Sequence, residues 1–351
     1  MQSTELRDIL APFNLIVNSK ALSINYRALA LSPTHVRGCS PFGVMEVEAA
    51  TGLSREVYVD GNSFLQILRS LPIDAFEMTA SDTGLSWKCG AAKGQLALLS
   101  EKVEIPAIEW PNKPFSEVSA NFSKALDLGG SACGTTALLS DGIYGIMIRN
   151  TDELSAFSSD NITIASAKLG DAIEDAPDTI TISPISQRLL SLVTGNKAAI
   201  AFTDKAVYCQ TPTSKLVIQQ TSQLKYDIKT TISNYLAQEN KIELNRDVIT
   251  SFIRRAEALS EEKNKAVVAI SVDNGTVRLS FNEDKASSEE YYLAEGGPDI
   301  KVDPVLVDVR KIAKALSSSS AIVFDYADRN SLVLHGENDF VFVVGGKSPT
   351  K

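Results

Sequence analysis

Residues 57–110 read VYVDGNSFLQILRSLPIDAFEMTASDTGLSWKCGAAKGQLALLSEKVEIPAIEW, and this stretch decides the fold because its pattern returns along the chain. It predicts a strand at 57–59, then a polar break at 60–63 that suits a helix N-cap. The helix that follows carries one apolar stripe at i, i+3, i+4 and i+7, made of Phe64, Ile67, Leu68 and Leu71. Pro72 ends it, and short strands follow at 76–80, 85–89 and 95–99. The unit is therefore a strand, a short helix and a three-stranded meander.

Similar helix-plus-strands units precede and follow this stretch. The first begins with a stripe at Leu6, Ile9, Leu10 and Phe13, interrupted by Pro12, and continues with strands at 21–26, 28–31 and 43–49. Later copies carry the stripes Ile185, Leu189, Leu192 and Val193; Ile249, Phe252, Ile253, Ala256 and Leu259; and Val305, Val309, Ile312, Ala313 and Leu316. A helix at 122–134 is weakened by Gly129 and Gly130. Asp273-Asn274-Gly275 predicts a tight hairpin.

The copies recur with a period of about 115 residues, three times over, and each period holds two halves. We therefore predict an α+β fold of three similar domains, at 1–113, 114–232 and 233–351, each with two helix-plus-antiparallel-sheet halves. The proline-rich segment 101–115 is an extended connector between the first two domains.

Composition narrows the function. The chain has 351 residues, 44% of them apolar and 22% charged, which is ordinary for a globular protein. No apolar run is long enough to span a membrane, and the N-terminus has no signal-peptide pattern, so we expect a cytoplasmic protein. The net charge of −9 argues against holding nucleic acid by overall attraction, although a locally basic lining stays compatible with it.

No motif indicates an enzyme, a cofactor or a metal site. The sequence has no phosphate-binding loop, no nucleophile elbow and no zinc-protease motif. His35 and His335 stand alone. Four separated cysteines are expected to be reduced thiols that pack as small apolar side chains: Cys39, Cys89, Cys133 and Cys209.

The order of these elements resembles the bacterial sliding clamp, the beta subunit of DNA polymerase III. The closest match is the helix SFLQILRSLP at 63–72, followed by three strands and an Ile-Pro…Trp connector at 105–110. Two further matches are ELSAFSSD at 153–160 and AEALSEEK at 256–263. Each motif is weak by itself, and the resemblance rests on their order over essentially the entire chain.

The resemblance implies that two three-domain chains close head to tail into a ring, of which each chain is half. Helices would line the hole around duplex DNA, and basic residues off the apolar stripes would face it without reading sequence. These residues are Arg7, Arg69, Lys124, Arg188, Arg254, Arg255, Arg310, Lys311 and Lys314. The competing interpretation is that they are ordinary solvated cations on helix faces.

The resemblance also implies a homodimer contact and a docking cleft for short peptides of polymerases and clamp loaders. By position, the dimer contact involves Leu96 and Leu98 of one chain and Leu259 of the other, although core positions explain these leucines equally well. The cleft would be lined by Ile143, Ser159, Ile162, Thr163, Ile164, Lys229, Val343 and Val344.

This cleft departs from the family pattern. The family's Thr-Asp-Gly-His-Arg-Leu is replaced by SDNITI at 159–164, and its apolar C-terminal Met-Pro-Met-Arg-Leu by GGKSP at 345–349. We therefore expect a different or weaker docking peptide, as would suit a phage-encoded clamp. The alternative function is a clamp-like scaffold or regulator that does not close around DNA.

Overall fold

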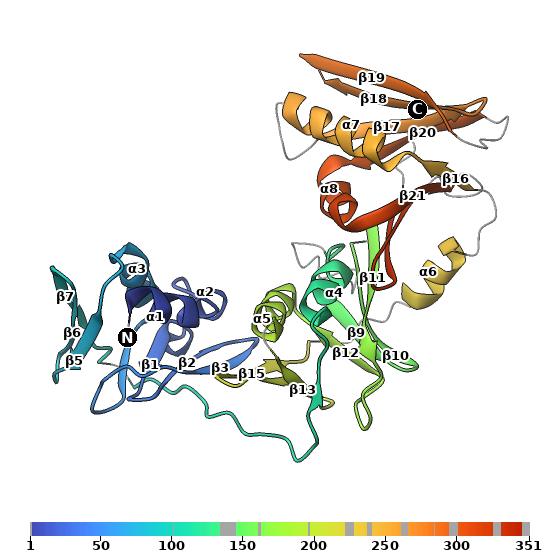
Figure 1. The fold of residues 1–351 in the computed structure, drawn as a ribbon. Helices are drawn as coiled ribbons and strands as arrows, with labels where there is room; N and C mark the ends of the chain where they lie inside the picture. The colour runs from blue at the N-terminus through green and yellow to red at the C-terminus, as the bar shows by residue number, and fades with distance from the viewer. Residues whose placement is uncertain are drawn as a thin grey trace. The chain divides into compact units, whose positions relative to one another are not determined.

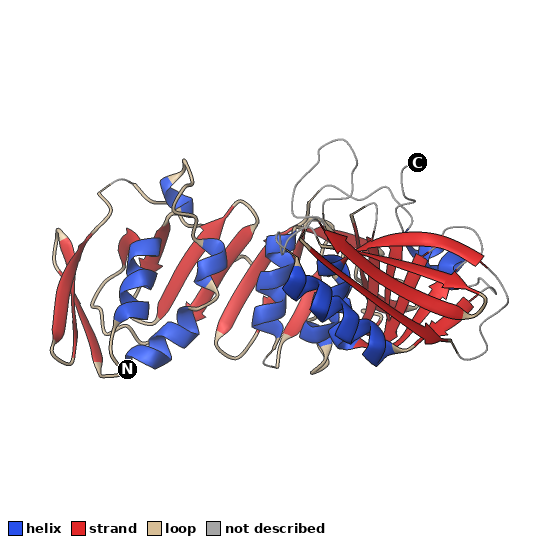
Figure 2. Ribbon diagram, turned by 90° about the horizontal axis from the view of Figure 1, so that it is seen from above, coloured by secondary structure: helices blue, strands red, loops and turns tan. Residues whose placement is uncertain are grey.

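The computed structural model describes residues 2–100, 102–133, 145–160, 163–195, 197–221, 228–236, 241–260, 266–283, 285–294, 301–325 and 331–345. The chain divides into two compact units, which are described separately: Met1–Ser123 with Ile173–Thr221, and Lys124–Ala172 with Ser222–Lys351. Both units consist of helices and antiparallel strands (Figure 1, Figure 2).

Six copies of a helix followed by strands occur in chain order, as the sequence predicts. The copies in the first half of the chain are α1 (Ser3–Leu10) with β1 (Ala28–Leu31), β2 (His35–Ser40), β3 (Gly43–Glu48) and β4 (Val57–Asp60); α3 (Gly61–Ser70) with β5 (Phe76–Ala80), β6 (Gly84–Cys89) and β7 (Ala92–Ala97); and α4 (Phe122–Gly129) with β9 (Ile146–Asn150), β10 (Glu153–Ser159), β11 (Thr163–Asp171) and β12 (Thr179–Ile182).

The remaining copies complete the repetition. They are α5 (Pro184–Thr194) with β13 (Ala199–Phe202), β14 (Ala206–Gln210) and β15 (Ser214–Gln219); α7 (Arg246–Leu259) with β17 (Val267–Asp273), β18 (Thr276–Glu283), β19 (Ala286–Leu293) and β20 (Lys301–Asp308); and α8 (Val309–Ser318) with β21 (Ser319–Asp325), β22 (Ser331–Gly336) and β23 (Phe340–Gly345). Shorter elements lie between them: α2 (Phe13–Ile16), η1 (Ile24–Tyr26), β8 (Ser116–Glu117), α6 (Ile228–Leu236) and β16 (Lys241–Leu244).

Local sequence signals account for several boundaries. The Asp60 carboxylate accepts a hydrogen bond from the Ser63 N–H at 2.9 Å, so it is the N-cap of α3. The Asn245 side chain caps α7 in the same way, accepting from two backbone N–H groups. Asn274 and Gly275 have φ values of 48° and 72°, the left-handed conformations that the predicted β17–β18 hairpin requires.

Two local predictions were wrong. Residues 21–26, predicted as a strand, instead form a loop ending in η1, in which the Asn18 N–H donates to Tyr26 O and the Ala21 N–H to Asn18 O. These local bonds satisfy the backbone that a strand would have paired with a neighbour. The strand that opens the 57–110 stretch belongs to the sheet of the preceding copy, because β4 pairs with β1.

Pairing across long sequence distances joins copies that are not neighbours in the chain. In the first unit the strand order is β4-β1-β2-β3-β15-β14-β13-β8, and β3 pairs with β15. In the second unit the order is β9-β10-β11-β23-β22-β21-β16, and β11 pairs with β23. The strands of the second and fifth copies form separate sheets, β5-β6-β7 and β19-β18-β17-β20. This pairing explains why the compact units cut through the predicted second domain.

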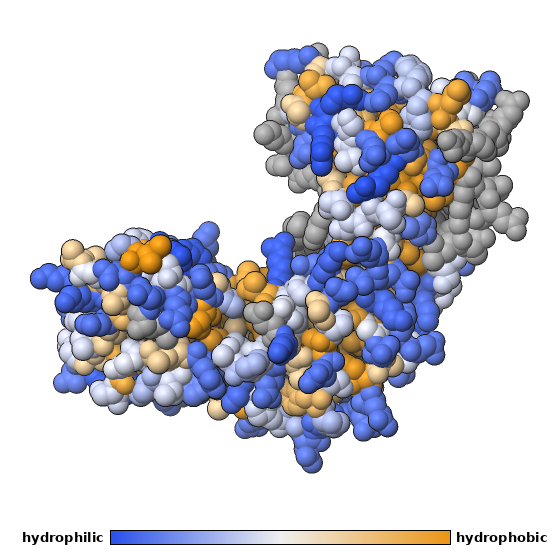
Figure 3. Space-filling model, in the orientation of Figure 1, coloured by the Kyte–Doolittle hydropathy of each residue, from blue (hydrophilic) through white to orange (hydrophobic). Residues whose placement is uncertain are grey.

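The apolar stripes supply most of the buried helix residues. On α7 the predicted Ile249, Phe252, Ile253 and Ala256 are buried, while Leu259 at the end of the helix is 42% exposed. Other large apolar side chains at the surface include Leu22, Ile73 and Leu293, and the face drawn in Figure 3 shows apolar patches scattered among hydrophilic residues. The core therefore lies between each helix and the sheet that it covers.

The predicted stripe of α5 was partly wrong. Leu189 and Val193 are buried, but Ile185 and Leu192 are exposed. Ser191 takes a buried place instead, and its hydroxyl exchanges hydrogen bonds of 2.9 and 3.0 Å with Ser123. Because a small polar residue packs at this helix contact, the buried face is rotated away from the one that hydrophobicity alone indicates.

Gly43 allows the close approach of β3 and β15. A Cβ at this position would lie 2.1 Å from the Val217 carbonyl oxygen, which belongs to backbone and cannot turn aside. We therefore expect Gly43→Ala to lower the free energy of unfolding by about 1–3 kcal/mol. Thermal unfolding followed by circular dichroism measures this. Gly170→Ala is the matched control, because a Cβ there would have no neighbouring atom within 4 Å; equal melting temperatures would contradict the role of Gly43.

Candidate functional site

Three of the predicted DNA-facing cations are exposed arginines without an ion pair in the described part of the chain. Arg69 lies on α3, Arg188 on α5 and Arg254 on α7. They thus belong to three different predicted domains. Their guanidinium groups are available to an anionic ligand without first leaving an acidic partner.

Three other predicted cations have acidic partners. Arg7 lies 3.8 Å from Asp8, and the Lys124 ammonium donates to Glu337 at 3.0 Å. Arg255 pairs with Glu290 of β19 and stacks over the Phe252 ring at 5.4 Å. These pairs reduce the local positive charge, so the six cations are not equivalent. The remaining predicted cations, Arg310, Lys311 and Lys314, lie on α8.

The outer face of the first unit's long sheet carries charged groups in one cross-strand row. Arg37, Glu46 and Lys215 are register neighbours on β2, β3 and β15. Arg37 lies 3.8 Å from Glu46, and Lys215 lies 3.6 Å from the same carboxylate. Arg37 also donates a hydrogen bond of 2.9 Å to Glu56. Burial raises the pKa of Glu56, but the hydrogen bonds from the Tyr58 hydroxyl and from Arg37 outweigh it, so the pKa is lowered.

The connector at 102–115, between the first two predicted domains, covers the adjacent row of this face. The Trp110 ring lies 6.2 Å from the Tyr208 ring and 5.2 Å from the Phe115 ring. The Lys215 ammonium lies 5.9 Å from the Trp110 ring centroid, within the range of a cation–π contact. An extended segment with an aromatic side chain therefore lies on this sheet.

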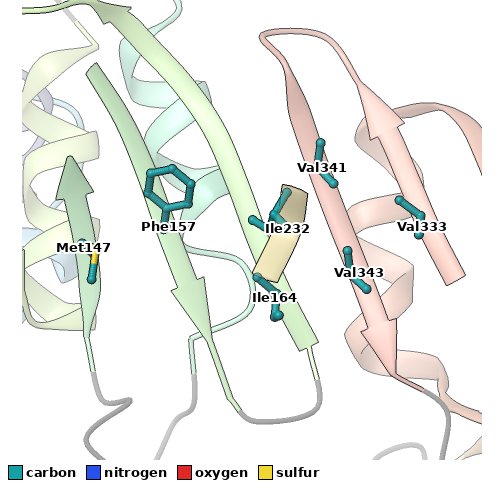
Figure 4. Packing of buried hydrophobic residues seen from close by; sticks show 7 residues of the cluster. All are labelled: Met147, Phe157, Ile164, Ile232, Val333, Val341 and Val343. Atoms are coloured by element: carbon teal, nitrogen blue, oxygen red, sulfur yellow. The ribbon is translucent and has the colours of Figure 1, made fainter. Parts of the chain in front are cut away.

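The second unit's long sheet has an apolar outer face instead. Its side chains come from five neighbouring strands and are covered by Ile232 of α6, as Figure 4 shows. The cluster consists of Met147, Phe157, Ile164, Ile232, Val333, Val341 and Val343. These seven side chains are buried, with exposed fractions of 1–8%, so a small apolar core lies here where the first sheet carries ion pairs.

The structure brings part of the predicted cleft onto this face. Ser159 pairs with Ile164, and Ile164 pairs with Val343, so these three share one row. Thr163 pairs with Val344, and both belong to the opposite face because side chains alternate along a strand. Lys229 lies at the rim on α6, 4.0 Å from Asp152. Ile143 and Ile162 lie outside the described residues.

Residue-by-residue transfer from the family pattern missed much of the apolar surface. Met147, Phe157, Ile232, Val333 and Val341 were not predicted as binding residues. One signal was available: β10 reads ELSAFSS, and an aromatic residue alternates there with Glu153, Ser155 and Ser159 on an otherwise polar face. An aromatic residue in such a polar row indicates that another segment or a ligand covers the row, and here Ile232 of α6 packs on it.

The leucines predicted at a dimer contact lie at or near the edges of the two separate sheets. Leu96 is on the edge strand β7 and is half-buried. Leu98 follows it and forms an isolated bridge with Val59 of its own chain. Leu259 ends α7, a helix that packs against the edge strand β19. Both edge strands have one side unpaired within the described residues.

The described residues contain no group of three or more His, Cys, Asp or Glu side chains arranged to hold a metal ion. Cys39, Cys89 and Cys209 are buried free thiols, as predicted, and burial raises the pKa of Cys39 to about 11 and that of Cys209 to about 12. These two thiols are therefore poor nucleophiles at neutral pH. Within the described elements, no helix has both the length and the apolar character to cross a membrane.

Comparison with known proteins identifies the fold. Neither a scan against protein-family models nor a search of curated proteins finds a match. Among solved structures, the chain matches the DNA polymerase III subunit beta of Pseudomonas aeruginosa with a TM-score of 0.78 and 16% identity, over 99% of each chain. It matches the DNA polymerase sliding clamp of Bacillus subtilis with a TM-score of 0.79 and 15% identity, over 100% of this chain and 98% of that one.

A third structure is the beta sliding clamp of C. crescentus with PEG bound to its putative beta-motif tethering region. It has a TM-score of 0.81 and 14% identity, over 99% of this chain and 98% of that one. These similarities confirm the predicted α+β fold of repeated helix-and-sheet halves, and they show that the chain has the sliding-clamp fold throughout its length.

Proposed function

We propose that this protein is a DNA sliding clamp, a processivity factor that encircles duplex DNA and tethers replication proteins to it. The observation that carries the proposal is the sliding-clamp fold over essentially the whole chain. No catalytic role and no cofactor form part of the proposal.

The ring would be a head-to-tail homodimer of three-domain chains, with the domains at 1–113, 114–232 and 233–351. A head-to-tail contact joins two different surfaces of the same chain. The edges of the two separate sheets supply two such surfaces, with Leu96 and Leu98 near one and Leu259 near the other. Pairing between edge strands adds main-chain hydrogen bonds to the apolar contact.

DNA would lie against the helices. Arg69, Arg188 and Arg254, one from each proposed domain, are exposed and have no ion pair in the described structure, which supports them as the principal phosphate contacts. Few and non-specific contacts let a clamp slide, and the net charge of −9 opposes tight static binding. Topology, rather than affinity, would keep the ring on DNA.

Replication proteins, including a DNA polymerase and a clamp loader, would dock through short peptides on the apolar outer face of the second unit. The C. crescentus clamp holds PEG at its putative tethering region, and a Pseudomonas aeruginosa clamp binds griselimycin. The low identity to all these clamps supports a divergent protein. We propose that it is phage-encoded and acts in the host cytoplasm.

The second candidate is a clamp-like scaffold that does not encircle DNA. The ion pairs of Arg7, Lys124 and Arg255 favour it, because they lower the positive charge on the helices.

Two measurements on the full chain separate the candidates. A clamp is expected to sediment as a dimer at micromolar concentration. After incubation with replication proteins of its own source, it should co-elute with circular DNA in gel filtration and be lost when one restriction cut makes the DNA linear. A monomer with equal retention on both DNA forms would overturn the clamp proposal and support the scaffold.

A further inference from the structure

A pocket of about 400 Å³ opens on the outer face of the second unit, beside the predicted cleft. Its floor includes Phe157 and Val341, Ile232 of α6 forms one wall, and Ser155 and Ser166 contribute hydroxyl groups. Of the predicted cleft residues, it includes only Lys229. The pocket therefore lies toward Ser155 and Lys168, away from the predicted cleft residues Ser159 and Ile164.

Strand register identifies the equivalent place in the first unit. Counting from the first residue of β3 and of β11, Glu46 and Ser166 are both the fourth residue. Glu46 pairs with Arg37 and Lys215, while Ser166 pairs with Phe157 and Val341. The row Arg37–Glu46–Lys215 thus corresponds to Phe157–Ser166–Val341. Three interacting charged residues in one unit are replaced by two apolar residues and a serine in the other.

The first unit also shows what this kind of face accommodates. Its own connector lies there in an extended conformation, and the Trp110 ring sits near Lys215, the counterpart of Val341, and Tyr208, the counterpart of Val333. In the second unit the covering residue is the aliphatic Ile232, and the pocket beside it is open. Ile232 thus takes the place on the second sheet that Trp110 takes on the first, and the open pocket adjoins it at Val341.

We infer that this pocket is an additional subsite for an aromatic side chain of a partner protein's extended docking peptide. The inference rests on the proposed tethering function and assigns it a specificity element. The Phe157 ring and the Val341 methyl groups offer apolar and ring–ring contacts to that side chain, which aromatic pairs favour by offset or edge-to-face packing.

The rim of the pocket is electrically balanced. The Lys168 ammonium lies 3.1 Å from Glu153, and Lys229 lies 4.0 Å from Asp152. The Ser155 hydroxyl also donates to Glu153 at 2.9 Å. Asp339 also lines the pocket, so Glu153 and Asp339 balance Lys168 and Lys229, and Asp152 adds one carboxylate beside Lys229. The pocket therefore has no excess of cations to select an acidic peptide. Selection therefore depends on the apolar side chain that fills it.

The experiment uses the full chain and a probe taken from its own connector. A fluorescein-labelled peptide of residues 106–115, PAIEWPNKPF, is titrated with the protein and followed by fluorescence anisotropy. The same peptide with alanine in place of tryptophan is the ligand control. We expect measurable binding of the tryptophan peptide and at least about tenfold weaker binding of the alanine peptide, as for loss of an interface anchor.

The protein variant transplants the ionic row of the first unit: Phe157→Arg, Ser166→Glu and Val341→Lys. In the first unit Arg37 and Lys215 pair with Glu46 at the same register positions. The introduced glutamate can therefore pair with the introduced arginine and lysine. We expect at least about tenfold weaker peptide binding by the graft. Ser280→Lys, a charge added on the β19-β18-β17-β20 sheet, is the control and should bind like the original chain.

Melting temperatures show whether the graft folds, and Phe157→Ser serves as the second variant if it does not. Equal binding by the original chain and a folded pocket variant would overturn the inference, as would absence of tryptophan-dependent binding at millimolar peptide. Retention on circular DNA is measured in parallel. Its loss in the original chain contradicts the proposed clamp function, whereas peptide binding tests the pocket alone.

Discussion

Replacing Arg69, Arg188 and Arg254 together by glutamate is expected to shorten residence on circular DNA at least about tenfold at physiological salt. Each arginine is exposed and has no ion pair in the described structure, so each contributes its full charge to the helix face. The replacement changes the charge by two at each of three positions, which turns phosphate attraction into repulsion. The measurement is the half-life of the protein–DNA complex in gel filtration or in a single-molecule assay.

The control has the same change in net charge at cations outside the helices: Arg55, Lys88 and Lys205, all replaced by glutamate. It should keep its residence time, because Lys88 lies on β6 and Arg55 and Lys205 lie in bends, outside every helix of the described residues. Equal residence times for the two triple variants would show that overall charge, and not these helix positions, governs contact with DNA. Unchanged dimerisation in both variants separates this effect from ring closure.

Leu259→Asp is expected to raise the dissociation constant of the proposed homodimer by at least about thirtyfold, the effect of losing a strong interface contact. Leu259 is 42% exposed at the end of α7, and a carboxylate there would have to be desolvated in an apolar contact. Sedimentation velocity across a concentration series measures the change. Retention on circular DNA should fall with it, since an open dimer has no closed path around the duplex.

Leu22→Asp is the matched control, because Leu22 is fully exposed and distant in sequence from the two sheet edges. It should leave both dimerisation and retention unchanged. A Leu259→Asp protein that stays dimeric would place the contact elsewhere. We expect both variants to keep the melting temperature of the original chain, because both leucines are exposed and contribute little to the core. An unchanged melting temperature shows that Leu259→Asp acts on association and not on folding.

Repetition and local chemistry made much of the fold predictable. The helix stripes, the Asp60 and Asn245 caps and the Asn274-Gly275 hairpin all depend on residues within a few positions of one another. The order of the six copies could therefore be inferred from periodicity. The stripe of α5 failed where the deciding contact was remote, between Ser191 and Ser123.

Sheet connectivity was not predictable in the same way. β3 pairs with β15, and β11 pairs with β23. No residue pattern in these strands indicates which strand each will pair with. The apolar face of the second unit depends on that pairing, because Val341 meets Ser166 and Phe157 only across it. Transfer from the resembling family supplied Ser159, Ile164 and Val343. It did not place Phe157 and Ile232 on this face, because their positions depend on this chain's own register and on α6.

The long-range pairing also affects folding during synthesis, because paired strands are translated at different times. Residues 43–48 of β3 are synthesised long before residues 214–219 of β15, their neighbour in the finished sheet. At ordinary rates of translation the interval is about ten to thirty seconds. During that time the edge of β3 that later pairs with β15 is unpaired. The same holds for β11 until β23 has been synthesised. Gly43, at the start of β3, has no side chain that would block the later approach of the β15 backbone at Val217.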